Sequence, residues 1–177
     1  MDSYKIVFSG SGGQGVITAA IVLAEAAVVY DKLHAVQAQS YGPEARGGAT
    51  RSDVIISDEK INYPKVSSPN LLVCLTQEAY NKFSNIVMPG GMIITDPKYV
   101  VISKSDATQL ELPMYDTVVE KVGNPICFNT CMLGVVVKIS NMVKVESIIK
   151  VFESRMPQKF VEINIKALKV GMELVSK

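Results

Sequence analysis

The sequence predicts one α/β domain over residues 1–177, a mostly parallel sheet flanked by helices with a helical C-terminal region. Three features favour this class. Short apolar runs alternate with helical segments, a glycine cluster directly follows the first run, and helical spacing dominates beyond residue 129. With 48% hydrophobic and 20% charged residues among 177, the chain has enough apolar surface to form one core.

The strands are predicted from apolar, β-branched runs. Residues 4–9 form a first strand that ends in the glycine cluster, and the continuous apolar run 71–76 predicts a central strand covered on both faces. Residues 49–57 and 60–63, joined at Asp58-Glu59, predict a hairpin. The other expected strands are residues 34–39, 92–95 and 100–102.

The helices are predicted from apolar spacing. Residues 14–30 are apolar nearly all round, which predicts a helix buried on most sides. The further expected helices are residues 77–85, 129–141, 146–156 and 157–175. In the last of these, one apolar stripe is predicted from the spacing of Phe160, Ile163, Ala167, Val170 and Leu174.

Charge and hydropathy narrow the class of partner. The chain has 18 Lys and Arg against 17 Asp and Glu, so it lacks the excess of basic residues that a phosphate-backbone binder needs. No apolar run reaches the ~18 residues of a membrane span, and the N-terminus does not resemble a signal peptide. We therefore expect a cytoplasmic protein that binds neither nucleic acid nor membrane.

The cysteine and histidine content argues against a metal site. Cys74, Cys127 and Cys131 form no CxxC pair, and His34 is the single histidine. A four-cysteine zinc site or an iron–sulfur cluster cannot be built from this set, so we expect buried thiols that act as small hydrophobes. There is likewise no G-x-S-x-G motif or credible Ser/His/Asp or Cys/His set, so no catalytic residue is predicted.

The segment Gly10-Ser11-Gly12-Gly13-Gln14-Gly15 matches G-x-G-x-x-G after a strand and before a helix. Such glycines let backbone N–H groups approach a phosphate at a helix N-terminus, or simply permit close strand–helix packing. The candidate phosphate contacts are Gly10, Gly12, Gly13, Gln14 and Gly15. A dinucleotide site is disfavoured because the second strand ends without a carboxylate and Asp31 precedes it; a P-loop is excluded because no Gly-Lys-Ser/Thr follows.

A second polar, glycine-rich loop spans residues 39–51. An arginine beside two glycines suits anion binding or docking against another protein, while the alternative is a solvated loop with a Glu44–Arg46 ion pair. The candidate docking residues are Ser40, Tyr41, Arg46, Gly47, Gly48 and Arg51.

Three stretches together resemble one family: the glycine segment 10–16, the segment Gln39-Ser40-Tyr41-Gly42-Pro43-Glu44-Ala45-Arg46-Gly47-Gly48, and residues 51–57. The chain resembles the gamma subunit of the 2-oxoacid:ferredoxin (acceptor) oxidoreductases. The form of the second loop is most similar to gamma chains of 2-oxoglutarate enzymes, with branched-chain 2-oxoacid enzymes close behind and pyruvate enzymes further away.

The resemblance implies a multi-subunit enzyme that oxidatively decarboxylates 2-oxoglutarate to succinyl-CoA. Alpha and beta subunits, with delta as a further candidate, would hold thiamine diphosphate, Mg²⁺ and iron–sulfur clusters, and ferredoxin or flavodoxin would accept the electrons. The gamma chain alone would bind no cofactor, and its glycine loop would meet coenzyme A as substrate. The residues expected to dock onto the alpha–beta core are Ser40, Tyr41, Arg46, Gly47, Gly48 and Arg51.

Two other classes stay open at this point. A stand-alone Rossmann-like oxidoreductase would bind a nucleotide by itself, and a non-catalytic interaction subunit would have a purely structural glycine loop. We also expect the chain to self-associate when it is expressed without partners.

Overall fold

The computed structural model describes residues 3–39 and 49–175. Its strands are β1 (Tyr4–Gly10), β2 (His34–Gln39), β3 (Thr50–Ser57), β4 (Leu71–Cys74), β5 (Met92–Thr95) and β6 (Thr108–Glu111). Its α-helices are α1 (Val16–Glu25), α2 (Gln77–Phe83), α3 (Met114–Lys121), α4 (Phe128–Ser140), α5 (Val145–Arg155) and α6 (Gln158–Val175). Shorter helical turns are η1 (Ala26–Tyr30), η3 (Ser84–Ile86) and η4 (Pro125–Cys127).

The described strands form one sheet in the order β2-β3-β1-β4-β5-β6. The pairs β1–β4, β4–β5 and β5–β6 are parallel, whereas β3 pairs antiparallel with both β1 and β2. Strand β3 is therefore the one described strand that runs opposite to the others, and the prediction of a mostly parallel sheet is confirmed.

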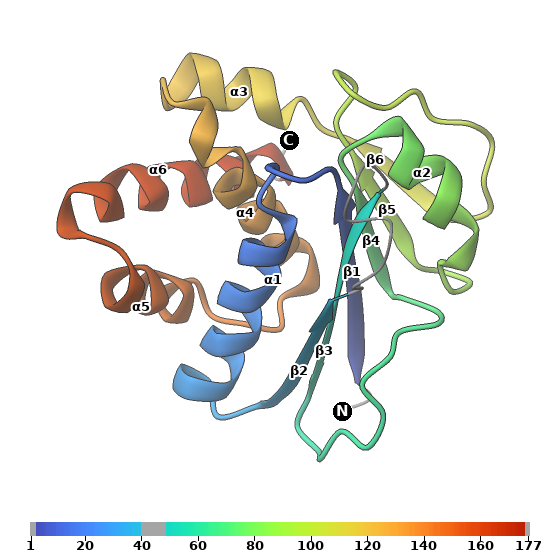
Figure 1. The fold of residues 1–177 in the computed structure, drawn as a ribbon, viewed down its shortest axis with the longest axis horizontal. Helices are drawn as coiled ribbons and strands as arrows, with labels where there is room; N and C mark the ends of the chain where they lie inside the picture. Colours follow the sequence, from blue (N-terminus) through green and yellow to red (C-terminus); the bar gives the residue numbers. More distant parts are fainter. Residues whose placement is uncertain (1–2, 40–48, 176–177) are drawn as a thin grey trace.

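Apolar residues alternate between the two faces of the sheet, as the two-residue period of a strand requires. Ile6 and Phe8 of β1 face the core shared with α1, α4, α5 and α6, while Val7 faces the smaller core beside α2. Figure 1 shows α1, α4, α5 and α6 on one side of the sheet and α2 on the other. The central position and complete burial of β4 confirm the prediction from its continuous apolar run.

The helical layer also follows the sequence closely. The long apolar segment becomes α1 and the π-turn η1, and α2, α4, α5 and α6 lie where helices were expected. The predicted stripe on α6 is partly wrong, because Phe160 is 46% exposed and the neighbouring Val161 is buried instead. Helices α4 and α6 pack backbone to backbone: a Cβ on Gly134 would lie 2.1 Å from Leu168 O, and one on Gly171 would lie 1.9 Å from Cys131 O.

Two predicted strands are wrong, and one strand and one α-helix were not predicted. Residues 60–63 form no strand and no hairpin with β3; the segment instead continues to Val66, which is buried in the smaller core. Residues 100–102 are also irregular, because the N–H groups of Tyr99 and Val100 donate to Asp96 O and turn the chain after β5. The unpredicted elements are the edge strand β6 and the short helix α3.

Candidate functional site: the glycine loop at the carboxyl edge of the sheet

The glycine loop and the described ends of the second motif lie at the same edge of the sheet. The glycine loop, residues 11–15, connects the end of β1 to α1. Gly10 at the end of β1 lies opposite Thr50 at the start of β3, and Gln39 at the end of β2 lies opposite Ser52. Ligands of open α/β sheets bind at the carboxyl ends of the strands, so this edge is the candidate site.

The side chain of Gln14 holds the glycine loop in place. Its Oε1 accepts a hydrogen bond from Ser11 N at 2.8 Å, and its Nε2 donates to Leu75 O at 3.1 Å, just beyond the end of β4. A Cβ on Gly10 would lie 2.5 Å from Gln14 Oε1. Gly10 and Gln14 therefore have a structural role in fixing the loop, which the sequence motif alone did not reveal.

Gly15 lies against the first turn of α4. Its φ of 74° is in the left-handed region, and a Cβ there would lie between 2.6 and 2.8 Å from three atoms of the Asn129 side chain. Glycine is required at this position by backbone conformation and by the close approach of Asn129. The sequence indicated Asn129 only as the start of a helix; its contact with the loop comes from the packing of α1 on α4.

The open part of the loop is Gly12 and Gly13. Both are exposed, and a Cβ on either would meet no atom within 4 Å. The loop leads into α1, whose first N–H groups have no intrahelical acceptors, and its N-cap residue Gly15 supplies no side-chain cap. The N-terminus of a helix carries partial positive charge, so an anion placed against Gly12 and Gly13 would be stabilised there.

Arg51 is the one predicted docking residue within the described part of the chain. Its Nε and Nη2 donate to Asp53 at 2.6 and 3.0 Å, Nη2 also donates to Val66 O, and the guanidinium lies 5.3 Å from the Phe83 ring centroid. Asp53 also accepts from Val66 N at 3.2 Å. Arg51 thus anchors the segment that crosses this face of the sheet, and its side chain is only 17% exposed.

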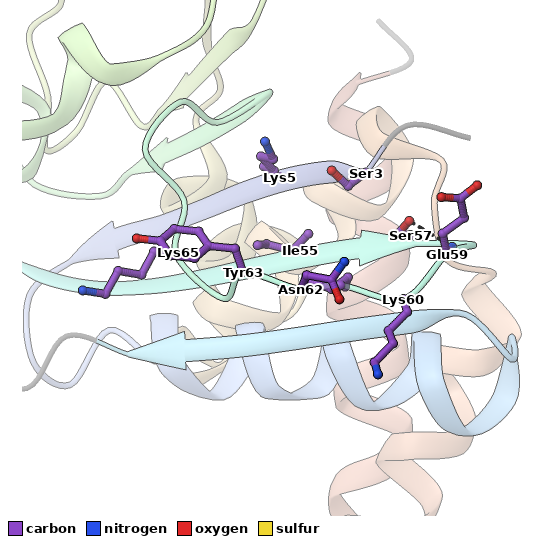
Figure 2. A pocket seen from close by; sticks show the side chains of 10 residues that line it. Ser3, Lys5, Ile55, Ser57, Glu59, Lys60, Asn62, Tyr63 and Lys65 are labelled. Carbon is purple, nitrogen blue, oxygen red and sulfur yellow. Dashed lines mark hydrogen bonds between the residues drawn. The ribbon is translucent and has the colours of Figure 1, made fainter.

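Figure 2 shows this segment with Tyr63 and Lys65 beside β3, next to a hollow of about 450 Å³. The other docking candidates lie outside the described residues: Ser40, Tyr41, Arg46, Gly47 and Gly48.

A buried carboxylate, Asp96, directly follows the last residue of β5 at the same edge of the sheet. Asp96 is fully buried, and its two oxygens accept from Lys98 N at 2.9 Å and from Tyr115 N at 2.8 Å in the first turn of α3. Burial is the main reason that the pKa of Asp96 is raised, and the nearby Asp116 adds to it. Asp96 therefore acts as an internal cap for α3, a residue that the sequence did not single out.

The cysteines are placed for packing. All three are buried, and burial raises the pKa of Cys74 and Cys131 to about 12. Residues 3–39 and 49–175 bring together no group of three or more His, Cys, Asp or Glu side chains that could hold a metal ion. The described residues therefore provide no set of side-chain ligands that fits an iron–sulfur cluster. Within the same residues, no helix has both the length and the apolar character of a membrane span.

The fold and the loop define an α/β domain with an exposed glycine loop at the carboxyl edge of its sheet. The sequence profile of one family, described as pyruvate ferredoxin/flavodoxin oxidoreductase, matches residues 5–174. The chain belongs to this family, which confirms the resemblance drawn from the loop motifs.

The relatives agree with this assignment. The chain is 42% identical over 173 residues to the 2-oxoglutarate synthase subunit KorC of Methanocaldococcus jannaschii, covering 96% of this chain and 92% of that protein. It is 31% identical over 173 residues to the ketoisovalerate oxidoreductase subunit VorA of Methanothermobacter thermautotrophicus, covering 96% of this chain but 36% of that longer protein.

A solved structure has the same fold. The gamma subunit of a keto/oxoacid ferredoxin oxidoreductase from Geobacter sulfurreducens PCA superposes with a TM-score of 0.91 at 39% identity, covering 99% of this chain and 98% of that one.

Proposed function

We propose that this chain is the gamma subunit of an enzyme that oxidatively decarboxylates 2-oxoglutarate to succinyl-CoA and passes the electrons to ferredoxin or flavodoxin. The observation that carries the proposal is the near full-length similarity to a 2-oxoglutarate synthase subunit, at 42% identity against 31% for the ketoisovalerate relative. A branched-chain 2-oxoacid or pyruvate enzyme is the alternative substrate class.

In the assembled enzyme, this chain contributes contacts that hold the subunits together and the loop that binds coenzyme A. Alpha and beta subunits, together with any delta subunit, hold thiamine diphosphate, Mg²⁺ and the iron–sulfur clusters, and the assembled enzyme works in the cytoplasm. The loop 40–48 docks onto these partners, and Arg51 supports this surface from within by anchoring the adjacent segment at Val66. The matching region makes up 36% of the longer ketoisovalerate subunit, and its presence in one chain with further sequence supports a permanent contact between this domain and its partners.

Substrate identity is tested on the assembled enzyme. Tagged chain is co-purified with its partners under anaerobic conditions, and coenzyme A-dependent reduction of a viologen dye is measured with 2-oxoglutarate, pyruvate and 2-oxoisovalerate. We expect the highest kcat/KM with 2-oxoglutarate. Highest activity with pyruvate or 2-oxoisovalerate would assign the enzyme to that substrate class instead. If the chain purified as a monomer without partners or activity, the proposal would be refuted.

The coenzyme A contact is assigned to Gly12 and Gly13, because their Cβ positions are open and the N-terminus of α1 follows. Phosphate oxygens of coenzyme A accept hydrogen bonds from backbone N–H groups at this loop. Gly10, Gln14 and Gly15 support the contact by fixing the loop, and they are included in the site for that reason.

Two variants of similar shape at position 12 test the effect of a negative charge on coenzyme A binding. Gly12→Asp and Gly12→Asn have nearly the same shape and meet open space, so they differ mainly by one negative charge. We expect Gly12→Asp to raise the KM for coenzyme A about tenfold above that of Gly12→Asn, since a carboxylate on the open loop repels the phosphate that the loop would bind. Equal KM values in the two assembled enzymes would remove the coenzyme A assignment while leaving the subunit assignment intact.

A further inference from the structure

Two side-chain amides touch the glycine loop, and they differ in whether the fold already uses them. The amide of Gln14 is used at both ends, because it accepts from Ser11 N and donates to Leu75 O. The amide of Asn129 makes no hydrogen bond within the described part of the chain, and its side chain is only partly buried. Asn129 is therefore the amide beside this loop that a ligand can still bind.

Asn129 is the second residue of α4, and its side chain lies over the start of α1. A Cβ on Gly15 would lie 2.6 Å from Asn129 Nδ2, which is nearer than any other atom outside the loop. Figure 1 shows α4 beside α1, on the same side of the sheet. The amide nitrogen of Asn129 is thus placed next to the loop by the packing of two helices.

The fold itself does not require an amide at position 129. Asparagine is a weaker helix former than leucine, and the N-cap of α4 is Cys127. Contact with Gly15 would be made equally well by leucine, which has nearly the same branched shape as asparagine. What leucine lacks is a hydrogen-bond donor, so the donor is the property of Asn129 that packing leaves unexplained.

A phosphate at the glycine loop would have few donors without Asn129. Residues 6–31 contain no Lys, Arg or His, so the loop offers no cationic side chain of its own. Ser11 N is occupied by Gln14 Oε1, and Gln14 N donates to Ser11 O at 3.3 Å. A phosphate has several strong acceptor oxygens, and neither α1 nor α4 has an acidic residue in its first turn that would repel it.

We propose that Asn129 is a coenzyme A-binding residue, whose side-chain amide donates a hydrogen bond to a phosphate oxygen held at Gly12 and Gly13. This inference rests on the proposed contact between the glycine loop and coenzyme A, and it adds a side chain from a distant part of the sequence to that contact. The backbone of the loop can accept an anion in several orientations. A donor fixed on α4 selects one of them.

Two substitutions in the assembled enzyme test the donor. Asn129→Leu keeps the shape and removes the donor, so we expect the KM for coenzyme A to rise about fivefold. Asn129→Asp adds a like charge and should raise it at least about tenfold. The KM for 2-oxoglutarate and the kcat at saturating coenzyme A should stay at the wild-type values. Asn85→Asp, at an exposed position in η3 before β5, is the matched control and should behave as wild type.

Inhibition by desulfo-coenzyme A measures binding without reaction, because this analogue keeps the phosphates and lacks the thiol. Its inhibition constant should rise by the same factors in the two Asn129 variants, while the midpoint of urea unfolding stays unchanged. Wild-type values for Asn129→Leu, or an equal rise in the KM for 2-oxoglutarate, would overturn the proposal.

The Gly12 variants, measured in parallel, separate this inference from the one on which it rests. If Gly12→Asp weakens coenzyme A binding relative to Gly12→Asn and Asn129→Leu does not, the loop contact stands and the role of Asn129 is refuted. If Gly12→Asp and Gly12→Asn bind coenzyme A equally, the loop contact itself fails, and the role of Asn129 fails with it.

Discussion

Glycines in two regions of this molecule have opposite surroundings. At the contact between α4 and α6, a Cβ on Gly134 or Gly171 would penetrate the backbone of the facing helix, at 2.1 and 1.9 Å from carbonyl oxygens. At the carboxyl edge of the sheet, a Cβ on Gly12 or Gly13 would meet nothing within 4 Å. The first pair is required by packing, and the second leaves backbone accessible from outside.

The difference shows how a glycine motif should be interpreted. Within G-x-G-x-x-G, Gly10 and Gly15 resemble the helix glycines, because Gln14 and Asn129 fill the space where their side chains would be. Only the middle of the motif resembles a ligand-binding loop. The two explanations of the motif, packing and phosphate approach, therefore apply to different glycines of the same segment.

The largest expected effect is at the helix contact. Gly171→Ala forces α4 and α6 apart along a fully buried surface, so we expect the free energy of unfolding to fall by about 3 kcal/mol. Urea unfolding followed by circular dichroism measures it. Gly12→Ala, which meets open space, is the matched control and should stay within about 0.5 kcal/mol of wild type. Similar losses in the two variants would remove the distinction between the two regions.

An intermediate effect is expected at Gly15. Gly15→Ala combines a left-handed φ with the Asn129 overlap, and we expect a loss of about 2 kcal/mol. In an Asn129→Gly background the overlap disappears and the φ penalty of about 1 kcal/mol remains. A double-mutant cycle measures this coupling. Additive effects would show that Asn129 does not determine the residue at position 15.

The accuracy of the sequence predictions follows the strength of the apolar pattern. Leu71–Cys74 and Met92–Thr95 lie in apolar runs, and both were predicted as strands. Strand β6 was missed because three of the four residues in Thr108–Glu111 are polar and the strand lies at an edge with little burial. Residues 60–63 resemble a strand in composition, but the Arg51–Asp53 pair binds Val66 and holds this segment across the face instead.

The position of the glycine loop in the fold was predictable from the sequence, but the structural roles of the residues around it were not. A glycine motif between a strand and a helix places the loop at the carboxyl edge. The roles of Gln14, Asn129 and Asp96 depend on contacts between elements far apart in sequence. Such contacts leave no local pattern, so no reasoning about spacing could have assigned them.

The smallest effect concerns Cys131, whose carbonyl oxygen faces Gly171. Burial, with a contribution from Asp96, raises the pKa of its thiol from 9.0 to about 12. The folded state therefore holds this proton more tightly than the unfolded state does. The corresponding stability is fully present below pH 9.0 and is lost as the pH rises toward 12.

Comparison with Cys131→Ala measures this loss, since the variant has no thiol to titrate at position 131. The difference in unfolding free energy between wild type and variant should be constant up to about pH 8 and should shrink by about 1.4 kcal/mol by pH 10. Urea titrations at each pH provide the values. A constant difference across the whole range would mean that solvent reaches the thiol in the native state, and the contact between α4 and α6 would then be less closed than its two glycines indicate.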